Sequence, residues 1–301
     1  MEPRLKKRLS AFYKLSRINE YGYLIIISTL FGVATAQGSF SWRWLWVLSS
    51  NFLALGFSYM VNDIEDAAVD ALSTRNSQRN PISSGSISPK NARLLAVIAG
   101  LISAGLFAML GLWSFVFGTS ILLVGFLYSF KAIRLKSIPL INNFSHGALL
   151  GGLPFLSGYF SFTSTLNRIW YWPFLWLFTV SILFNLQHKS FNGEKGSLSP
   201  DQEIEAPPSK KYSNLIETIL VVMAAATGIV SLFLINLLPL WVVLTMFVSF
   251  VFLVVPIFIK ERREKTSSSF LGLMIYGVER ALAVGLMAQF LLPWLVRFFI
   301  E

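Results

Sequence analysis

The sequence contains no cysteine, only two histidines and few charged residues. Without cysteine, the chain forms neither disulfides nor thiolate metal sites, and it has no cysteine nucleophile. Charged residues make up 13% of the 301 residues, whereas hydrophobic residues make up 54%. Because so few charged side chains remain to cover a water-exposed surface, the composition favours an integral membrane protein.

Long apolar runs fill nearly the whole chain. A helix needs about 20 apolar residues to cross the hydrocarbon core of a bilayer. Nine runs approach that length: 21–38, 43–62, 92–111, 112–130, 140–162, 168–188, 214–234, 236–259 and 271–299. We therefore expect an all-α integral membrane fold of about nine transmembrane helices, formed by a single domain at 21–299 that follows a basic tail at 1–20.

The basic residues predict the orientation of these helices. Of the 25 Lys and Arg residues, 21 lie on one side of the expected membrane, in or beside five segments. These segments are the N-terminal tail, 63–91, 131–139, 189–213 and 260–268. The positive-inside rule assigns this side, with the N-terminus, to the cytoplasm of a cell-membrane protein. The net charge of +10 then reflects topology and attraction to anionic lipids and phosphorylated substrates, rather than binding of nucleic acid.

An acidic motif stands at the end of the second run. Asp63, Asp66 and Asp70 have the spacing i, i+3, i+7, so they share one face of a helix, whereas Glu65 points elsewhere. Three carboxylates at a helix C-terminus repel one another and the negative end of the helix dipole. A divalent cation would relieve this repulsion, and Mg²⁺ binds through a few carboxylates together with substrate phosphates.

Basic residues follow the acidic motif and the fourth run on the same side. Arg75 and Arg79 come shortly after the carboxylates, and Lys131 and Arg134 follow the fourth run. Such cations suit a diphosphate whose other oxygens contact a metal ion. Lys131 and Arg134 also have a simpler interpretation as snorkelling residues that anchor the helix ends.

A neutral counterpart of the acidic motif ends the sixth run. Asn185, His188 and Asn192 repeat the spacing i, i+3, i+7, and Glu194 is the nearby carboxylate. The longest cytoplasmic loops, 63–91 and 189–213, follow these two runs. The two helix ends therefore predict matching polar faces that border one cavity open towards the cytoplasmic side.

These residues resemble the UbiA superfamily of intramembrane prenyltransferases. The family's first motif, N-D-x-x-D-x-x-x-D, is matched in full by Asn62, Asp63, Asp66 and Asp70. The continuation R-P-I-x-S-G is similar to Arg79–Gly85, and the Y-x-x-K element is similar to Tyr128–Lys131. The second motif, D-x-x-D-x-x-x-D, departs from the family pattern, because Asn185, His188 and Asn192 replace its aspartates.

The resemblance implies Mg²⁺-dependent transfer of a polyprenyl group from its diphosphate to a lipophilic acceptor. Metal would bind Asn62, Asp63, Asp66 and Asp70, and diphosphate would bind Arg75, Arg79, Lys131 and Arg134. The acceptor side would consist of Asn185, His188, Asn192 and Glu194. Because the second motif lacks aspartates, one Mg²⁺ site is expected and a second would be held less well.

The neutral second motif leaves an alternative open. The chain would then be a weakly active or inactive relative that binds isoprenoids or lipids, or transports them. Inverted repeats and interrupted helices are typical of transporters, and the sequence shows neither. Glu279 and Arg280 in the last run favour packing between helices over chemistry, since charges inside a membrane need partners.

Overall fold

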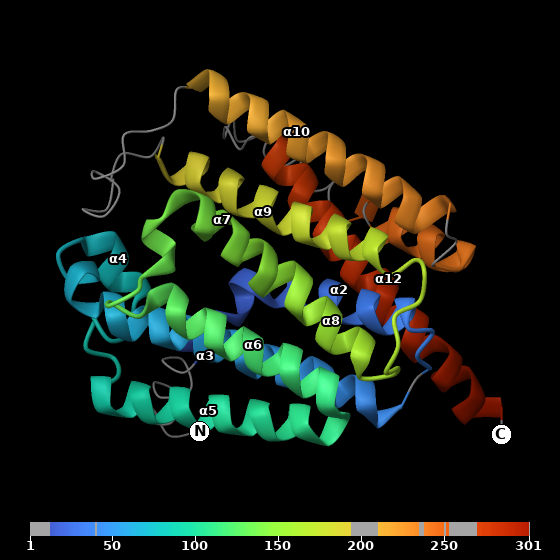
Figure 1. Cartoon of the computed structure of the whole chain (residues 1–301), viewed down its shortest axis with the longest axis horizontal. Coiled ribbons are helices and arrows are strands. Elements are labelled where there is room, and N and C mark those ends of the chain that lie inside the picture. The colour runs from blue at the N-terminus through green and yellow to red at the C-terminus, as the bar shows by residue number, and fades with distance from the viewer. Residues whose placement is uncertain are drawn as a thin grey trace.

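A computed structural model describes residues 13–39, 41–193, 210–234, 238–249, 251–252 and 270–300. Within these ranges all regular secondary structure is helical, as expected (Figure 1). The elements are α2 (Ile18–Thr35), α3 (Trp42–Asp70), α4 (Thr74–Arg79), α5 (Pro89–Leu110), α6 (Leu112–Ser129), η1 (Leu135–Ser137), α7 (Pro139–His146), η2 (Gly147–Gly152), α8 (Leu153–Phe160), α9 (Tyr171–Gly193), α10 (Lys210–Ile229), η3 (Val230–Leu234) and α12 (Phe270–Ile300).

Five helices are long and apolar enough to cross a membrane: α2, α3, α5, α6 and the segment Leu215–Leu232. Shorter apolar helices at Tyr171–Leu186 and Leu240–Ser249 lie in the sixth and eighth expected runs. The fifth run consists of three consecutive segments, α7, η2 and α8. The full count of nine spans stays a prediction.

Helix α3 extends further than its apolar run. It continues through the acidic motif and ends at Asp70, so the aspartates occupy its last turns and share a face as the spacing predicts. The expected loop at 63–91 is therefore largely helical, since α4 follows at Thr74–Arg79. Helix α4 and the segment that joins α6 to α7 lie at the same end of the bundle, at the left of Figure 1. The end of α3 is thus surrounded by polar segments.

Glycines allow α2 and α8 to pack with their backbones in close contact. A Cβ atom on Gly32 would lie 2.1 Å from the carbonyl oxygen of Phe155. On Gly158 it would lie 2.4 Å from the carbonyl oxygen of Thr29. Small residues at helix crossings are typical of membrane proteins, because close approach increases van der Waals contact where the hydrophobic effect is weak.

Buried hydrogen bonds join the same helices to α3. The Asn51 amide donates to Thr29 Oγ1 at 2.9 Å and accepts from Ser157 Oγ at 3.0 Å. At the end of α3 far from the acidic motif, Arg43 donates to the carbonyls of Leu110 (2.8 Å) and Ser161 (3.0 Å). These bonds satisfy polar groups that lipid cannot solvate, and they fix α3 as a framework for the site.

The segment η2 is a π-helix that interrupts the helix between α7 and α8. Its turn is wider than that of an α-helix, because hydrogen bonds span five residues instead of four. A Cβ atom on Gly151 would lie 2.4 Å from the carbonyl oxygen of Leu177, so this turn packs directly against the backbone of α9. Leu149 and Leu150 on the same turn line a cavity.

Candidate active site

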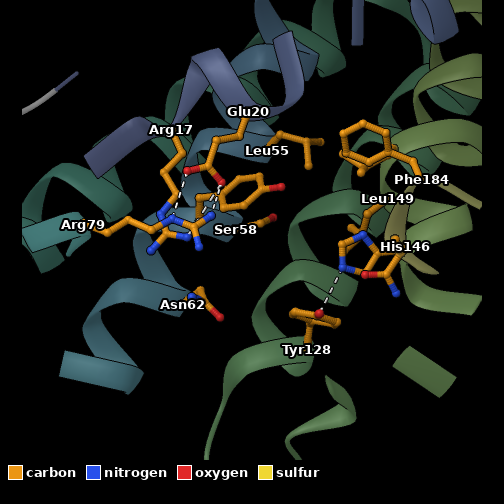
Figure 2. Close-up of a pocket in the computed structure, with 13 residues that line it drawn as sticks. Arg17, Glu20, Leu55, Ser58, Asn62, Arg79, Tyr128, His146, Leu149 and Phe184 are labelled. Atoms are coloured by element: carbon orange, nitrogen blue, oxygen red, sulfur yellow. Dashed lines mark hydrogen bonds and ion pairs between the residues drawn. The ribbon is translucent and has the colours of Figure 1, made fainter. Parts of the chain in front are cut away.

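A cavity of about 440 Å³ lies beside the acidic end of α3. Figure 2 shows Arg17, Glu20 and Arg79 on one side of it, and Tyr128 and His146 on the other. The apolar part of the lining consists of Leu55, Leu149, Leu150 and Phe184. The remaining lining residues are Ser58, Tyr59, Asn62 and Asn185. The cavity therefore combines a charged wall, an uncharged polar wall and an apolar region.

The charged wall is held together by Glu20. Arg79 Nε donates to Glu20 Oε1 at 3.1 Å, and a second guanidinium nitrogen binds the other carboxylate oxygen. Arg17 Nη1 lies 3.9 Å from Glu20 Oε2. Partial burial alone would lower the pKa of Arg79, but hydrogen bonding to Glu20 and its negative charge raise the pKa above its ordinary value. Arg79 therefore stays protonated.

Arg17 also forms a buried ion pair with Asp63. Arg17 Nη2 donates to Asp63 Oδ1, and the guanidinium carbon lies 5.9 Å from the centre of the Tyr59 ring. Arg17 has a φ of 48°, in the left-handed region, which costs an L-residue about 1–2 kcal/mol. Its contacts with Asp63 and Tyr59 stabilise this conformation and direct the side chain to the end of α3.

Asp66 binds two cations from the segment after α6. Lys136 Nζ binds Asp66 Oδ2, and Arg134 Nη2 lies 3.3 Å from Asp66 Oδ1. Asn62 Oδ1 accepts from Lys136 Nζ at 3.0 Å and from Ser129 Oγ at 3.1 Å. This cluster links the first motif to the end of α6.

Asp70 takes an amide partner. Asn80 Nδ2 donates to Asp70 Oδ2 at 2.9 Å and to the backbone carbonyl of Asp63 at 2.8 Å. Asn80 Oδ1 accepts from the backbone nitrogen of Ile82 at 2.9 Å. One buried side chain thus ties the segment after α4 to the last turns of α3.

The uncharged wall is a hydrogen-bonded network from α6, α7 and α9. The Tyr128 hydroxyl donates to Asn142 Oδ1 at 3.0 Å and lies 3.1 Å from His146 Nε2. Because that hydroxyl proton goes to Asn142, the geometry favours a histidine tautomer in which Nε2 donates to the Tyr128 oxygen. Asn185 Nδ2 donates to Asn143 Oδ1 at 2.9 Å.

A second, mostly apolar cavity of about 240 Å³ lies between α2, α9 and α12. Phe184 lines both cavities, and Glu279 lines only this one. The guanidinium carbon of Arg280 lies 4.4 Å from the centre of the Tyr23 ring. This contact supports the interpretation of Arg280 as a residue that packs α12 against α2.

Some of the expected site residues line the cavity, and others lie away from it. Asn62, Arg79 and Asn185 line the cavity, and Arg134 reaches Asp66. Arg75 and Lys131 are exposed and do not line it. His188 and Asn192 belong to α9, but their side chains, like the whole of Glu194, lie outside the described residues.

The structure adds Arg17, Glu20, Asn80 and Lys136 to the charged part of the site, none of which was predicted to be a site residue from the sequence. Lys136 lies in the basic segment 131–139, and Asn80 lies inside the element Arg79–Gly85, so both were near a recognised signal. Arg17 and Glu20 precede the first apolar run, and nothing in their local sequence indicates a contact with residues 46 or 59 positions away.

The end of α3 offers suitable ligands for a magnesium ion. Within the described ranges, no three His, Cys, Asp or Glu side chains are close enough to hold one metal. Each aspartate of the motif has a partner of its own. Asp63 Oδ2, however, is buried and has no hydrogen-bond partner. Carboxylate oxygens on one helix face are the hard ligands that Mg²⁺ prefers, so the donor set fits this ion.

Solved structures of similar fold cover almost the whole chain. One is a digeranylgeranylglyceryl phosphate synthase, with 19% identity, a TM-score of 0.62, and coverage of 94% of this chain and 99% of that one. Another is a UbiA homologue from Archaeoglobus fulgidus bound to GPP and Mg²⁺, with 16% identity, a TM-score of 0.60 and coverage of 93% and 99%. An apo UbiA homologue from Aeropyrum pernix K1 has 15% identity, a TM-score of 0.60 and coverage of 90% and 98%.

No curated protein matches the sequence. A sequence model of the UbiA prenyltransferase family matches residues 25–278. This range includes the acidic end of α3, the Arg79–Gly85 element and the uncharged wall of the cavity. The chain is therefore a multi-pass membrane protein that belongs to the UbiA prenyltransferase family.

Proposed function

We propose that the protein is a membrane prenyltransferase that moves a polyprenyl group from its diphosphate to a lipophilic acceptor with Mg²⁺. The observation that carries the proposal is the cavity itself, in which Arg17, Glu20 and Arg79 adjoin an apolar lining. The first motif reaches the cavity through Asn62, and Asp63 contacts it through its ion pair with Arg17. An isoprenoid diphosphate has the same division into an anionic head and an apolar chain. The similar UbiA homologues bound to GPP or DMAPP with Mg²⁺ support this assignment.

The charged wall would bind the diphosphate. Arg17 and Arg79 line the cavity. Lys136 contacts Asn62, which also lines it, and shares Asp66 with Arg134. Asp63, Asp66 and Asp70, with Asn62, would hold the metal, which offsets the charge that develops on the departing diphosphate. The arginines stabilise that charge by donating hydrogen bonds to phosphate oxygens.

The apolar lining would hold the isoprenoid chain and exclude water. In the reaction the bond between C1 of the prenyl group and the diphosphate oxygen breaks, and its electron pair leaves with the diphosphate. The acceptor nucleophile forms a new bond to C1 and loses its proton. Leu55, Leu149 and Phe184 keep water from C1, because water would compete for the allylic cation.

The uncharged wall would face the acceptor. Tyr128 and His146 lie across the cavity from the arginines (Figure 2), and Asn185 also lines the cavity. An acceptor bound beside them approaches C1 from the side away from the diphosphate. His188, Asn192 and Glu194 are proposed to complete this side. From the positive-inside rule we infer that this polar end, with the N-terminus, faces the cytoplasm.

The test is a turnover assay with the purified protein in lipid nanodiscs. With Mg²⁺, labelled geranylgeranyl diphosphate and a lipid extract as acceptor source, we expect release of diphosphate and labelled lipid product. Asp66→Asn should abolish turnover. The control variant is Glu65→Gln, which neutralises an acidic residue of the same helix outside the motif face, and it should retain turnover. Absence of turnover with several acceptors, together with unchanged donor binding in Asp63→Ala and Asp66→Ala, would refute the proposal that the protein is a prenyltransferase.

The second candidate function is binding of isoprenoids without transfer. It is favoured by Asn185, a neutral side chain at a position that is acidic in the family motif, whose amide is already engaged by Asn143. A binding protein would take up the labelled diphosphate with Mg²⁺ but release no diphosphate with any extract.

A further inference from the structure

The ion pair between Arg17 and Asp63 leaves one polar atom of each side chain unsatisfied. Arg17 Nη2 donates to Asp63 Oδ1, yet Arg17 Nε and Asp63 Oδ2 are buried without a hydrogen-bond partner among the described residues. Arg17 is 8% exposed and Asp63 is 0% exposed. Buried polar atoms are rarely left unsatisfied, so an unsatisfied donor and an unsatisfied acceptor within one ion pair indicate that ligands complete both.

The two unsatisfied atoms require ligands of opposite charge. A buried carboxylate oxygen is completed by a cation, and a guanidinium N–H is completed by an anionic oxygen. Arg17 lines the cavity beside Arg79, where the proposed function places the diphosphate. A metal with a diphosphate would therefore satisfy both atoms at once.

We propose that Arg17 competes with the metal for Asp63 and changes partner, from Asp63 to the diphosphate, when the donor binds. In the ligand-free protein Arg17 supplies the positive charge that the buried carboxylate needs. When metal takes over Asp63, the guanidinium is released towards the phosphate oxygens. This inference rests on the proposed function, because it takes the donor to be a prenyl diphosphate.

The surroundings of Arg17 favour such an exchange. Glu20 Oε2 lies 3.9 Å from Nη1, and the Tyr59 ring centre lies 5.9 Å from the guanidinium carbon. Both groups attract a cation, so the guanidinium keeps favourable contacts when it leaves Asp63. The residue itself sits at the break between the helical turn at 13–16 and α2.

The exchange predicts effects of opposite sign on two ligands. Removing the guanidinium takes away a competitor of the metal, so metal binding in the absence of donor becomes tighter. The same change removes a contact with the diphosphate, so donor binding becomes weaker. An arginine with a structural role alone would weaken both when it is removed.

The experiment compares Arg17→Gln with Lys14→Gln, in which an exposed basic residue one turn earlier is neutralised. The full chain in nanodiscs is titrated calorimetrically with Mg²⁺ alone, and then, at saturating Mg²⁺, with geranylgeranyl thiolodiphosphate, a non-transferring donor. For Arg17→Gln we expect Mg²⁺ to bind about tenfold more tightly and the thiolodiphosphate at least about tenfold more weakly, whereas Lys14→Gln changes neither.

Unchanged or weaker Mg²⁺ binding in Arg17→Gln would overturn the exchange. Should that variant fail to fold, Arg17→Met replaces it, because methionine keeps an unbranched side chain but carries no charge; Mg²⁺ binding no tighter than in the wild type would then overturn the exchange. A wild type that binds both ligands but transfers to no acceptor would overturn the proposed function alone. A wild type that binds no Mg²⁺ would overturn both.

Discussion

Asn80 donates to the carboxylate of Asp70 at 2.9 Å and to the backbone carbonyl of Asp63 at 2.8 Å, through one side-chain nitrogen. Asn80 is fully buried. It therefore fixes both ends of the acidic face of α3 to the segment that carries Arg79. We expect this single amide to fix the position of the diphosphate-binding arginine relative to the metal-binding face.

Asn80→Ala should destabilise the protein and impair the site. The variant leaves the Asp70 carboxylate and the Asp63 carbonyl without their amide donor, and loss of a hydrogen bond to a charged group costs about 1.5–3 kcal/mol. Thermal unfolding in detergent measures the loss. Asn91→Ala is the control, since Asn91 is exposed on α5; equal stability of the two variants would contradict this role of Asn80.

Lys136 should matter more for turnover than Lys131. Lys136 binds Asp66 and Asn62, whereas Lys131 is exposed after α6. If Lys136 helps to stabilise the leaving diphosphate, Lys136→Gln should lower kcat/KM for the donor by about 10²-fold, in the range of a lost electrostatic contact. A larger loss in Lys131→Gln would restore the importance of the Y-x-x-K element and contradict the structure.

Tyr128→Phe should affect the acceptor rather than the donor. The change removes the hydroxyl that joins Asn142 and His146 but keeps the ring in place. We expect a higher KM for the acceptor or a lower kcat, with Mg²⁺-dependent binding of the thiolodiphosphate unchanged. Initial rates at varied donor and acceptor concentrations separate the two effects, and a selective loss of donor affinity would refute the assignment of this wall.

Phe184→Ala should alter the preferred length of the donor. Phe184 lines both the 440 Å³ cavity and the apolar 240 Å³ cavity, so removal of its ring would join them. We expect kcat/KM for longer donors to rise relative to that for geranyl diphosphate. Leu55→Ala, which enlarges only the first cavity, is the matched control and should not produce the same preference.

Gly158→Ala should disrupt the packing of α2 against α8 and lower the melting temperature. The new Cβ atom would lie 2.4 Å from a backbone oxygen, and backbone cannot move aside as a side chain does. Gly105→Ala on α5 meets nothing within 4 Å, and alanine favours a helix over glycine by about 1 kcal/mol. The two substitutions should therefore shift the melting temperature in opposite directions, and a shift of the same sign would contradict the close crossing.

The positions of the first four long helices, α2, α3, α5 and α6, and the shared face of the acidic motif were predictable from the sequence, because run length and helical period determine them. The choice of Lys136 over Lys131 was not. Arg134 adopts a left-handed conformation with a φ of 44°, and the short helix η1 then brings Lys136 back towards Asp66. That reversal depends on the folded turn, and no spacing rule anticipates it.

The partners of the aspartates were also beyond sequence reasoning. Arg17 and Asp63 are 46 positions apart, and their contact depends on how α2 packs against α3. The basic tail indicates membrane topology, and nothing in its sequence distinguishes Arg17 from the other basic residues there. The family resemblance directed attention to motifs, whereas these ion pairs arise from the packing around them.

The π-helix η2 sets the angular phase between the two halves of its helix. Each residue advances an α-helix by about 100°, and a residue of a π-helix advances it by less, because its turn is wider. If Gly147–Gly152 formed a regular α-helix instead, the half that contains His146 would be rotated relative to the half that contains Gly158. With Gly158 in contact with α2, the imidazole would then point away from Tyr128. The wide turn thus lets one continuous helix satisfy two packing requirements that a regular helix would bring into conflict.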